Sequence, residues 1–347
     1  MQTLKALNVA IPLVFPSLTV LATPNDIDTL KAVMPQSTQS PNFNYQIEQQ
    51  HAKEITMQSM TLNTQVGPIA ANLYLPKGNN QAPLIVVTGA WTSVKEQMPA
   101  VYAKAFAEKG YAALTFDFRG WGETQRIHSQ TQPFVEDPAT KTQDIIAVLQ
   151  AANRLEGVDA SRIGGLAICA SAGYMLDAAL ESSHLQSVAV VAPWLHDKAM
   201  AAEIYGGEES TSRLIALARE AKQQNEPQLI EAASLENDNA LMYQVPYYTE
   251  NNRGLVKEYD NQFNVASWEQ WLTYDAQQSA LKQEKPVLMV ASEAMALPQG
   301  AHQYLSNAGD NVKAIWLEGI TQFDFYDQSK AVNTAVQAVT EHFNHHL

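Results

Sequence analysis

The chain has 347 residues, of which 46% are apolar and 17% are charged, which is ordinary for a protein that buries a substantial core. Its formal net charge of −14 argues against nucleic acids and anionic membrane surfaces as partners, because both select for Lys and Arg. Cys169 is the sole cysteine, so an intramolecular disulfide is excluded.

The N-terminal residues are typical of an export signal. Lys5 supplies a short positive region, residues 6–21 form an apolar stretch, and a small-x-small pattern ends at Ala22. An uncleaved membrane anchor or a buried helix are the alternatives, but Pro12 and Pro16 would interrupt a segment that is already short for a span. We therefore expect cleavage after Ala22 and a periplasmic or secreted mature protein that is not held in the membrane.

After a polar linker, strand-like and helix-like segments alternate along the chain. This pattern predicts an α/β fold with a mostly parallel central sheet flanked by helices. In chain order, the expected elements are strands Ile55–Leu62, Ile69–Tyr74 and Leu84–Thr88, helix Ala100–Glu108, strand Ala112–Phe116, helix Thr142–Leu155, strand Ile163–Ile168, helix Ser171–Leu180, strands Val188–Ala192, Val287–Ala291 and Val312–Leu317, and a terminal helix over about Gln328–Phe343.

The long stretch between the strands Val188–Ala192 and Val287–Ala291 has a different character. It is helix-prone over Ser210–Lys222 and Glu226–Ser234 and then rich in Tyr, Trp and Phe. We expect a helical lid over the carboxyl ends of the strands, where open α/β sheets bind ligands, although a helical subdomain away from any site would give the same pattern. The predicted parts are a signal peptide (1–22), a first part of the core (23–193), the lid (194–284) and a second part of the core (285–347).

The segment from Arg162 to Tyr174 carries a candidate nucleophile. A buried strand runs into a cluster of small residues and directly into a helix, which is the sequence form of a nucleophile elbow. Cys169 and Ser171 both fit as the nucleophile; we favour Cys169, because the strand Ile163–Ile168 places it at the turn and leaves Ser171 in the first helical turn, where it could cap. A thiol at a helix N-terminus has a depressed pKa, so we expect a partly ionised Cys169 near neutral pH. A small buried core residue is the alternative.

Two further segments follow predicted strands. Gly89–Gln97 comes after the third strand, and Phe116–Thr124 reads Phe-Asp-Phe-Arg-Gly-Trp-Gly-Glu-Thr. Together with the elbow, they resemble the dienelactone-hydrolase-like branch of the α/β-hydrolase family, particularly its bacterial members with a helical lid, over almost all of the mature chain. Phe116–Thr124 is similar to that family's Asp-x-Arg-Gly-x-Gly-x-Ser segment, with Thr124 in the serine place. The elbow is similar to its Gly-x-Cys-x-Ser/Gly pattern, with Ala167 in place of the first glycine.

The resemblance implies the α/β-hydrolase fold and a hydrolase of carboxylic esters, thioesters or lactones. It also implies that the loop after the third strand carries oxyanion donors, so the backbone N–H groups expected to hold the oxyanion are those of Ala90, Trp91 and Ala170. The aromatic residues of the lid favour a fairly apolar acyl or aryl group as substrate or ligand.

The same family implies an acid after a late strand and a histidine after the last one. Glu293 follows the strand Val287–Ala291 and matches the acid. Residues 319–327 match the pattern Gly-x-Thr-His-x-Asp-x-Tyr-Asp, but the histidine place holds Gln322. An amide cannot move a proton at neutral pH, and loss of a triad base typically costs about 10⁴ to 10⁶ in turnover. We therefore expect slow or single-turnover acylation.

Two other histidines could replace the missing base. His196 and His302 are the candidate replacement bases, although each fits a solvated surface histidine better, and Asp324, Tyr326 and Asp327 are expected to brace their loop. No spacing resembles a zinc site or a Gly-rich phosphate loop, so we expect no metal and no cofactor.

Two functions remain open at this point. The first is a hydrolase in which Cys169 or Ser171 attacks the carbonyl and Glu293 orients the base that is present. The second is a catalytically inactive protein of the same fold that binds a small apolar ligand or a protein partner. Gln322 is compatible with either and also with a deliberately introduced substitution, and the oligomeric state is not indicated by the sequence.

Overall fold

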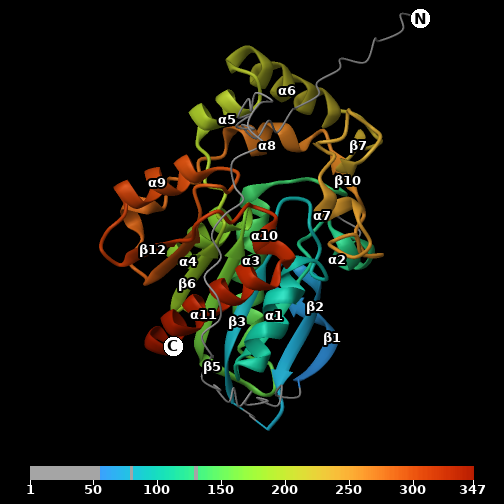
Figure 1. Ribbon diagram of the computed structural model, residues 1–347. Helices are drawn as coiled ribbons and strands as arrows, with labels where there is room; N and C mark the ends of the chain where they lie inside the picture. The colour runs from blue at the N-terminus through green and yellow to red at the C-terminus, as the bar shows by residue number, and fades with distance from the viewer. Residues whose placement is uncertain (1–54, 79–80, 129–131) are drawn as a thin grey trace, which may run out of the picture. The chain divides into compact units, whose positions relative to one another are not determined.

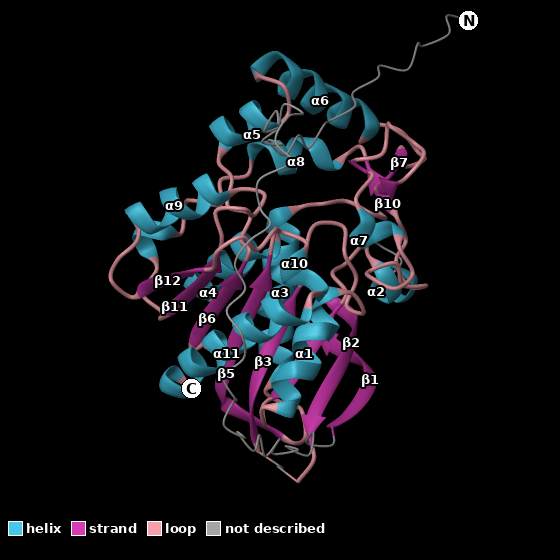
Figure 2. Cartoon of the chain, in the orientation of Figure 1, coloured by secondary structure: helices cyan, strands magenta, loops and turns pink. Residues whose placement is uncertain are grey.

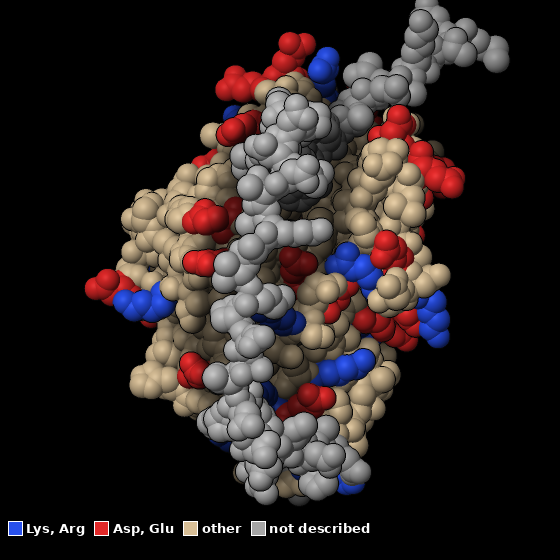
Figure 3. All heavy atoms as spheres, viewed as in Figure 1, with Lys and Arg blue, Asp and Glu red and all other residues tan. Residues whose placement is uncertain are grey.

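The computed structural model describes residues 55–78, 81–128 and 132–347 of the chain (Figure 1). The expected signal peptide, with cleavage after Ala22, lies outside these residues. Within the described ranges, we find no helix with both the length and the apolar character needed to cross a bilayer. On the face drawn in Figure 3, acidic and basic side chains are interspersed over the described surface.

The core is one eight-stranded sheet in the order β1-β2-β4-β3-β5-β6-β11-β12. The strands are β1 (Ile55–Thr64), β2 (Gly67–Pro76), β3 (Ala82–Thr88), β4 (Ala112–Phe116), β5 (Val158–Ile168), β6 (Ser187–Val191), β11 (Val287–Ala291) and β12 (Val312–Trp316). β2 pairs antiparallel with both β1 and β4, and all the other pairings are parallel. The expected mostly parallel sheet is therefore confirmed, with an antiparallel hairpin at one edge.

Helices cover both faces of this sheet (Figure 2). They are α1 (Met98–Glu108), α2 (Gly122–Ile127), α3 (Pro138–Ala152), α4 (Ser171–Glu181), α9 (Pro298–Asn307), α10 (Asp324–Asp327) and α11 (Ser329–His346). α1 packs with α11 on one face, and α3 packs with α4 on the other. β3, β4 and β11 are continuous apolar runs because helices cover both of their faces.

The region expected to be a lid contains helices and short strand pairs. Its elements are α5 (Lys198–Ile204), α6 (Glu208–Ala221), β7 (Leu229–Glu231), β8 (Ala233–Ser234), β9 (Met242–Tyr243), α7 (Pro246–Thr249), β10 (Gln262–Asn264), α8 (Ser267–Thr273) and a 3₁₀ turn, η1 (Ala280–Lys282). α5, α6 and α8 lie side by side. The helix expected over Glu226–Ser234 is wrong, because β7 and β8 there pair with β10 and β9, and such distant partners override local propensity.

Candidate active site

The candidate nucleophile occupies a strained turn. Cys169 directly follows β5 and has φ +61°, a left-handed conformation that costs a non-glycine residue of order 1–3 kcal/mol and occurs mostly where the surroundings enforce it. Its N–H donates to the carbonyl of Val191 (3.1 Å), and its carbonyl accepts from Trp194 N–H (3.0 Å). These two bonds fix the turn to the end of β6 and to the loop that follows.

The small residues around the turn are required by close packing. A Cβ on Gly165 would lie 2.5 Å from the sulfur of Met175 in α4. A Cβ on Gly173 would lie 2.6 Å from the hydroxyl of Tyr274. The strand before the turn and the helix after it therefore approach each other, and the lid, too closely for larger side chains.

Ser171 supports the turn from within. Its hydroxyl accepts from Thr88 Oγ1 (2.9 Å) and donates to the carbonyl of Ile168 (3.2 Å), and its side chain is completely buried. Both hydrogen-bonding roles of the hydroxyl are thus used between β3 and β5. The positive φ and the 7% exposure of Cys169 make the thiol the group that the turn presents.

Two backbone N–H groups from separate elements act on the Cys169 thiol. They belong to Ala170, at the start of α4, and to Trp91, in the loop after β3. The N–H of Ala90 is directed elsewhere, because it donates to Sδ of Met98 at 3.5 Å. Of the three donors expected from the sequence, the structure thus brings Trp91 and Ala170 to the thiol and leaves Ala90 out.

The loop that carries Trp91 is held by a buried ion pair. Asp117 accepts from the backbone N–H and from Nζ of Lys95, both at 2.8 Å. Burial is the largest single influence and lowers the pKa of Lys95, but the carboxylates of Asp117 and Glu96 together raise it more, so the amine stays charged. Thr124 completes this corner, because its hydroxyl donates to the carbonyl of Asp117 (2.8 Å) and accepts from Ala70 N–H (2.9 Å). The segment Phe116–Thr124 therefore braces the loop Gly89–Gln97, which carries Trp91 and is called the oxyanion loop below for its expected role.

A second buried ion pair lies behind the same loop. Oε2 of Glu136 accepts from the N–H of Thr92 at 3.4 Å, and Oε1 accepts from the Tyr174 hydroxyl at 2.8 Å. Nζ of Lys141 pairs with this carboxylate at 2.8 Å and lies over the rings of Phe118 and Trp121. Glu136 thus ties the oxyanion loop to α3 and α4, a role that nothing in the sequence pattern indicated.

Gln322 is buried, with 3% exposure, and its amide is fully bonded. Its Oε1 accepts from the backbone N–H of Ala296 (3.0 Å), and its Nε2 donates to the carbonyl of Ala192 (2.9 Å) and to the hydroxyl of Tyr326 (3.1 Å). Gln322 therefore connects the end of β6 with the loops after β11 and β12.

Glu293 does not reach this group. Its side chain is 70% exposed, and its Oε1 lies 2.8 Å from Nε2 of His302, whose ring stacks on Trp316. The carboxylate is turned outward because the loop after β11 directs the backbone N–H of Ala296, and not a carboxylate, toward Gln322. The expected acid is thus a surface residue paired with one of the two candidate replacement bases.

The other candidate base is also engaged. His196 is buried, its Nε2 lies 2.9 Å from the carbonyl of Trp271, and its Nδ1 accepts from Trp194 Nε1 at 3.1 Å. Burial lowers its pKa to about 4, so the imidazole is neutral with both nitrogens used. Other described histidines have partners in other parts of the fold: His128 with Val66, His184 with Asn153, and His342 with Ser187.

Tyr326 is the residue of this site that the sequence analysis missed. It was expected only to brace its loop, but its hydroxyl acts on the Cys169 thiol as a hydrogen-bond donor and accepts from Gln322. It lies four residues after Gln322, at the turn of α10 (Asp324–Asp327). That spacing places two side chains on one side of a helical turn, and it is the signal in the sequence that could have indicated the contact.

The Cys169 thiol is not predisposed to ionise. Burial raises its pKa to about 11, and the three hydrogen-bond donors around it offset only part of that rise. The expected partly ionised thiol is therefore wrong, because the lid removes the sulfur from water and desolvation disfavours the charged form. The group at the turn is a neutral thiol at pH 7.

Aromatic side chains of the lid surround the oxyanion loop. The ring of Trp91 stacks on Trp271 (5.2 Å between centroids) and contacts Phe263 (4.9 Å) and Trp268 (6.1 Å). Nε1 of Trp271 donates to the hydroxyl of Tyr205 at 2.8 Å. The lid therefore packs on the loop that carries the Trp91 N–H donor, and its surface there is apolar and aromatic.

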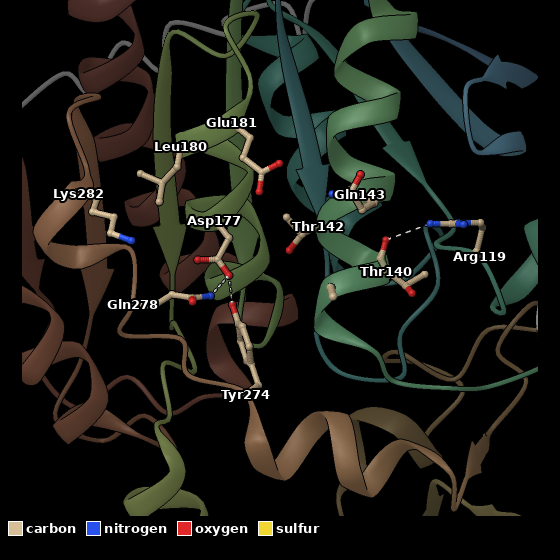
Figure 4. A pocket seen from close by; sticks show the side chains of 11 residues that line it. Arg119, Thr140, Thr142, Gln143, Asp177, Leu180, Glu181, Tyr274, Gln278 and Lys282 are labelled. Atoms are coloured by element: carbon tan, nitrogen blue, oxygen red, sulfur yellow. Dashed lines mark hydrogen bonds between the residues drawn. The ribbon is translucent and has the colours of Figure 1, made fainter. Parts of the chain in front are cut away.

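A separate surface cavity of about 540 Å³ opens between α3, α4 and the segment that leads to β11 (Figure 4). Asp177 lines it, and Oδ2 of this residue accepts from the Tyr274 hydroxyl (2.7 Å) and from Gln278 Nε2 (3.1 Å). These bonds anchor the end of the lid to α4, and Cys169 does not line the cavity. Among the described residues, no group of three or more His, Cys, Asp or Glu side chains is arranged to hold a metal ion.

Known proteins of this fold resemble the chain. The family described as "Esterase FrsA-like" matches residues 32–205. An uncharacterized 31.7 kDa protein of Escherichia coli, encoded in the traX-finO intergenic region, is 25% identical over 286 residues, which cover 80% of this chain and 96% of that protein. The crystal structure of the hypothetical protein PA2218 of Pseudomonas aeruginosa has a TM-score of 0.73 at 21% identity and covers 91% of this chain and 100% of that one. The dienelactone hydrolase of Anabaena variabilis has a TM-score of 0.51 at 11% identity and covers 84% and 99%.

Proposed function

We propose that this chain, which belongs to the FrsA-like esterase family, takes an acyl group from a carboxylic ester, thioester or lactone onto Cys169 and releases the acid slowly. One observation carries the proposal: the Cys169 thiol stands on a strained turn and faces the backbone N–H groups of Ala170 and Trp91. A carbonyl attacked by Sγ would place its oxygen beside these donors, which is the arrangement of an oxyanion hole.

The slow release follows from the surroundings of the thiol. Gln322 supplies an amide where the family keeps its histidine, and Glu293 is paired with His302 at the surface. A water molecule that attacks the acyl-enzyme would lack an imidazole to take its proton. In serine proteases that lack a triad residue, the oxyanion hole and substrate binding still accelerate the reaction by about 10³ to 10⁴ over water. The attacking group is a thiol in acylation and water in deacylation, and sulfur is the stronger nucleophile, so acylation is expected to outpace deacylation.

The substrate class follows from the lid. Trp91 is partly exposed next to the expected oxyanion donor and packs on the buried rings of Phe263, Trp268 and Trp271. Flat apolar groups stack on such rings, and each aromatic pair contributes about 0.5–1.5 kcal/mol beyond the area it buries. We expect an aryl or apolar acyl group rather than a charged one.

A second candidate function is retention of the same ligand without turnover. It is favoured by the hydrogen bonding of Gln322, because both N–H groups of its amide are already donated, to Ala192 and to Tyr326. In that case the elbow would serve as a binding surface and Cys169 would stay unmodified. Both candidates share the site and differ in whether a covalent bond forms.

Mixing the protein with p-nitrophenyl benzoate and following p-nitrophenol and intact mass separates the two. We expect one equivalent of p-nitrophenol in a burst, a benzoyl adduct on the peptide that contains Cys169, and slow turnover afterwards. Cys169→Ala should abolish the burst and the adduct, whereas Ser171→Ala should keep both. The absence of an adduct on Cys169 at saturating ester, in protein that binds the ester, would overturn the proposal and leave the binding function.

A further inference from the structure

The hydroxyl of Tyr326 lies between the amide of Gln322 and the Cys169 thiol. Nε2 of Gln322 donates to it at 3.1 Å, and on its other side the hydroxyl interacts with Sγ of Cys169. The side chain is 1% exposed. The Tyr326 hydroxyl is the side-chain donor that most lowers the pKa of this thiol.

The direction of these hydrogen bonds is fixed by the backbone. Gln322 faces one obligate donor, the N–H of Ala296, and one obligate acceptor, the carbonyl of Ala192. Only one orientation of the amide satisfies both, with oxygen toward Ala296 and nitrogen toward Ala192. The nitrogen end therefore also faces Tyr326, whose oxygen must accept. The phenolic proton is left to point away from Gln322, toward the thiol.

The phenol is also fixed in position. Its ring packs edge-on against Tyr247 (5.0 Å, 77°) and Phe323 (5.5 Å, 89°). Burial raises the pKa of Tyr326 well above its ordinary value, so the hydroxyl is neutral at pH 7. A neutral, immobile hydroxyl can accept one proton while it gives up another, without ever becoming charged.

We propose that Tyr326, positioned by Gln322, is the catalytic residue that moves the proton during acylation of Cys169. This inference rests on the proposed function and adds the group that replaces the imidazole. In the step, the Sγ–C bond forms and the carbonyl electron pair moves to oxygen, held by Ala170 and Trp91. When the ester is in place, the O–H of Tyr326 turns from Sγ to the leaving-group oxygen, and the Tyr326 oxygen accepts from the thiol instead. The thiol proton then passes to the oxygen of Tyr326, the proton of Tyr326 passes to the leaving-group oxygen, and the C–O bond breaks. Alcohol leaves, and the phenol ends neutral, as it began.

The test is the dependence of the acylation rate on the leaving group. p-Nitrophenolate leaves without a proton, whereas phenol and p-chlorophenol leave more easily when one is supplied. We expect Tyr326→Phe to slow acylation by phenyl benzoate by about 10²-fold, within the range of general acid–base catalysis, and to slow acylation by p-nitrophenyl benzoate far less. Tyr247→Phe is the matched control, because it removes a hydroxyl from the ring that packs on Tyr326, and it should leave both rates unchanged.

The outcomes distinguish this inference from the function it rests on. If the parent protein forms no acyl adduct with any ester, the proposed function fails. If the parent is acylated and Tyr326→Phe slows all esters equally or none, the function stands and the role of Tyr326 is refuted, because a merely structural hydroxyl would not discriminate between leaving groups. If Tyr326→Phe does not fold, 3-fluorotyrosine at position 326 keeps the hydrogen bonds with a more acidic phenol. It should then change the leaving-group dependence, and an unchanged dependence would refute the role.

Discussion

Asp177 offers a test of the electrostatics that anchor the lid. Oδ2 of this residue accepts two hydrogen bonds, from Tyr274 and Gln278, whereas its Oδ1 is buried without a partner. Burial raises the pKa of this carboxyl from 3.8 to about 6, and the hydrogen bonds offset only part of that rise. The folded protein therefore holds the Asp177 proton more tightly than the unfolded chain does.

The sign and size of the effect follow from this difference. Because the folded state binds the proton more tightly, the contribution of Asp177 to the free energy of unfolding is largest below pH 4. This contribution is lost as the pH rises through 6. A difference between 3.8 and about 6 corresponds to about 3 kcal/mol. Asp177→Asn, which cannot ionise, should thus gain about 3 kcal/mol relative to the parent between pH 4 and pH 7.

Urea unfolding of the parent and of Asp177→Asn from pH 4 to pH 8 measures this gain directly. Glu181→Gln is the control, because it removes an exposed carboxylate from the same helix and the same cavity. The charge of Glu181 is the smallest of the named causes that raise the Asp177 pKa, so this variant should change the pH dependence far less. A difference in stability between Asp177→Asn and the parent that stays constant from pH 4 to pH 8 would refute the reasoning.

Three further predictions concern the oxyanion loop and the histidine place. Gly122→Ala should lower the unfolding free energy by about 1–3 kcal/mol in denaturant titrations, because Gly122 has φ +51° and a Cβ would lie 2.5 Å from the Asp117 carboxylate. Lys95→Met should cost about 3–5 kcal/mol in the same assay, because it leaves Asp117 buried without its cation. Gln322→His should raise steady-state p-nitrophenyl ester hydrolysis less than about tenfold, because Glu293 is not positioned to orient an imidazole; a rise of several orders of magnitude would contradict this.

The central strands of the sheet could be predicted from the sequence because they are buried on both faces. A continuous apolar run such as β11, Val287–Ala291, has no alternative reading once helices flank it, and the expected bounds match the observed ones. Helix starts were less accurate. α3 begins at Pro138 and not at Thr142, although Asp137 caps it by accepting from two N–H groups of the first turn, a signal that the sequence contained.

The lid shows where local pattern fails. Glu226–Ser234 has the composition of a helix, but its strands β7 and β8 exist because Gln262–Asn264 and Met242–Tyr243 pair with them. Pairing between segments that are distant in the chain depends on how the whole lid folds over the core. The periodicity and the secondary-structure propensity of the segment do not predict this pairing.

Some features of the candidate site are likewise local in the sequence, and others depend on tertiary packing. Small residues around Cys169 and the pattern at residues 319–327 are local features, and the sequence was sufficient to find the turn at Cys169. That Gln322 stands in the place of a catalytic histidine stays a prediction. The exposure of Glu293 and the raised pKa of Cys169 depend instead on how the loops and the lid pack. For that reason the sequence predicted an oriented acid and an ionised thiol, and the structure has neither.

The hydrogen bonds of Gln322 show whether the surroundings of position 322 fit an amide or an imidazole. A neutral imidazole has one donor and one acceptor, whereas Gln322 uses one acceptor and two donors, to Ala296, Ala192 and Tyr326. A histidine there would leave at least one of these buried partners unsatisfied, at a cost of about 1–3 kcal/mol. The surroundings are therefore complementary to the amide itself. The same amide directs the phenolic proton of Tyr326 toward the thiol, so Gln322 positions the group that we propose as the proton carrier.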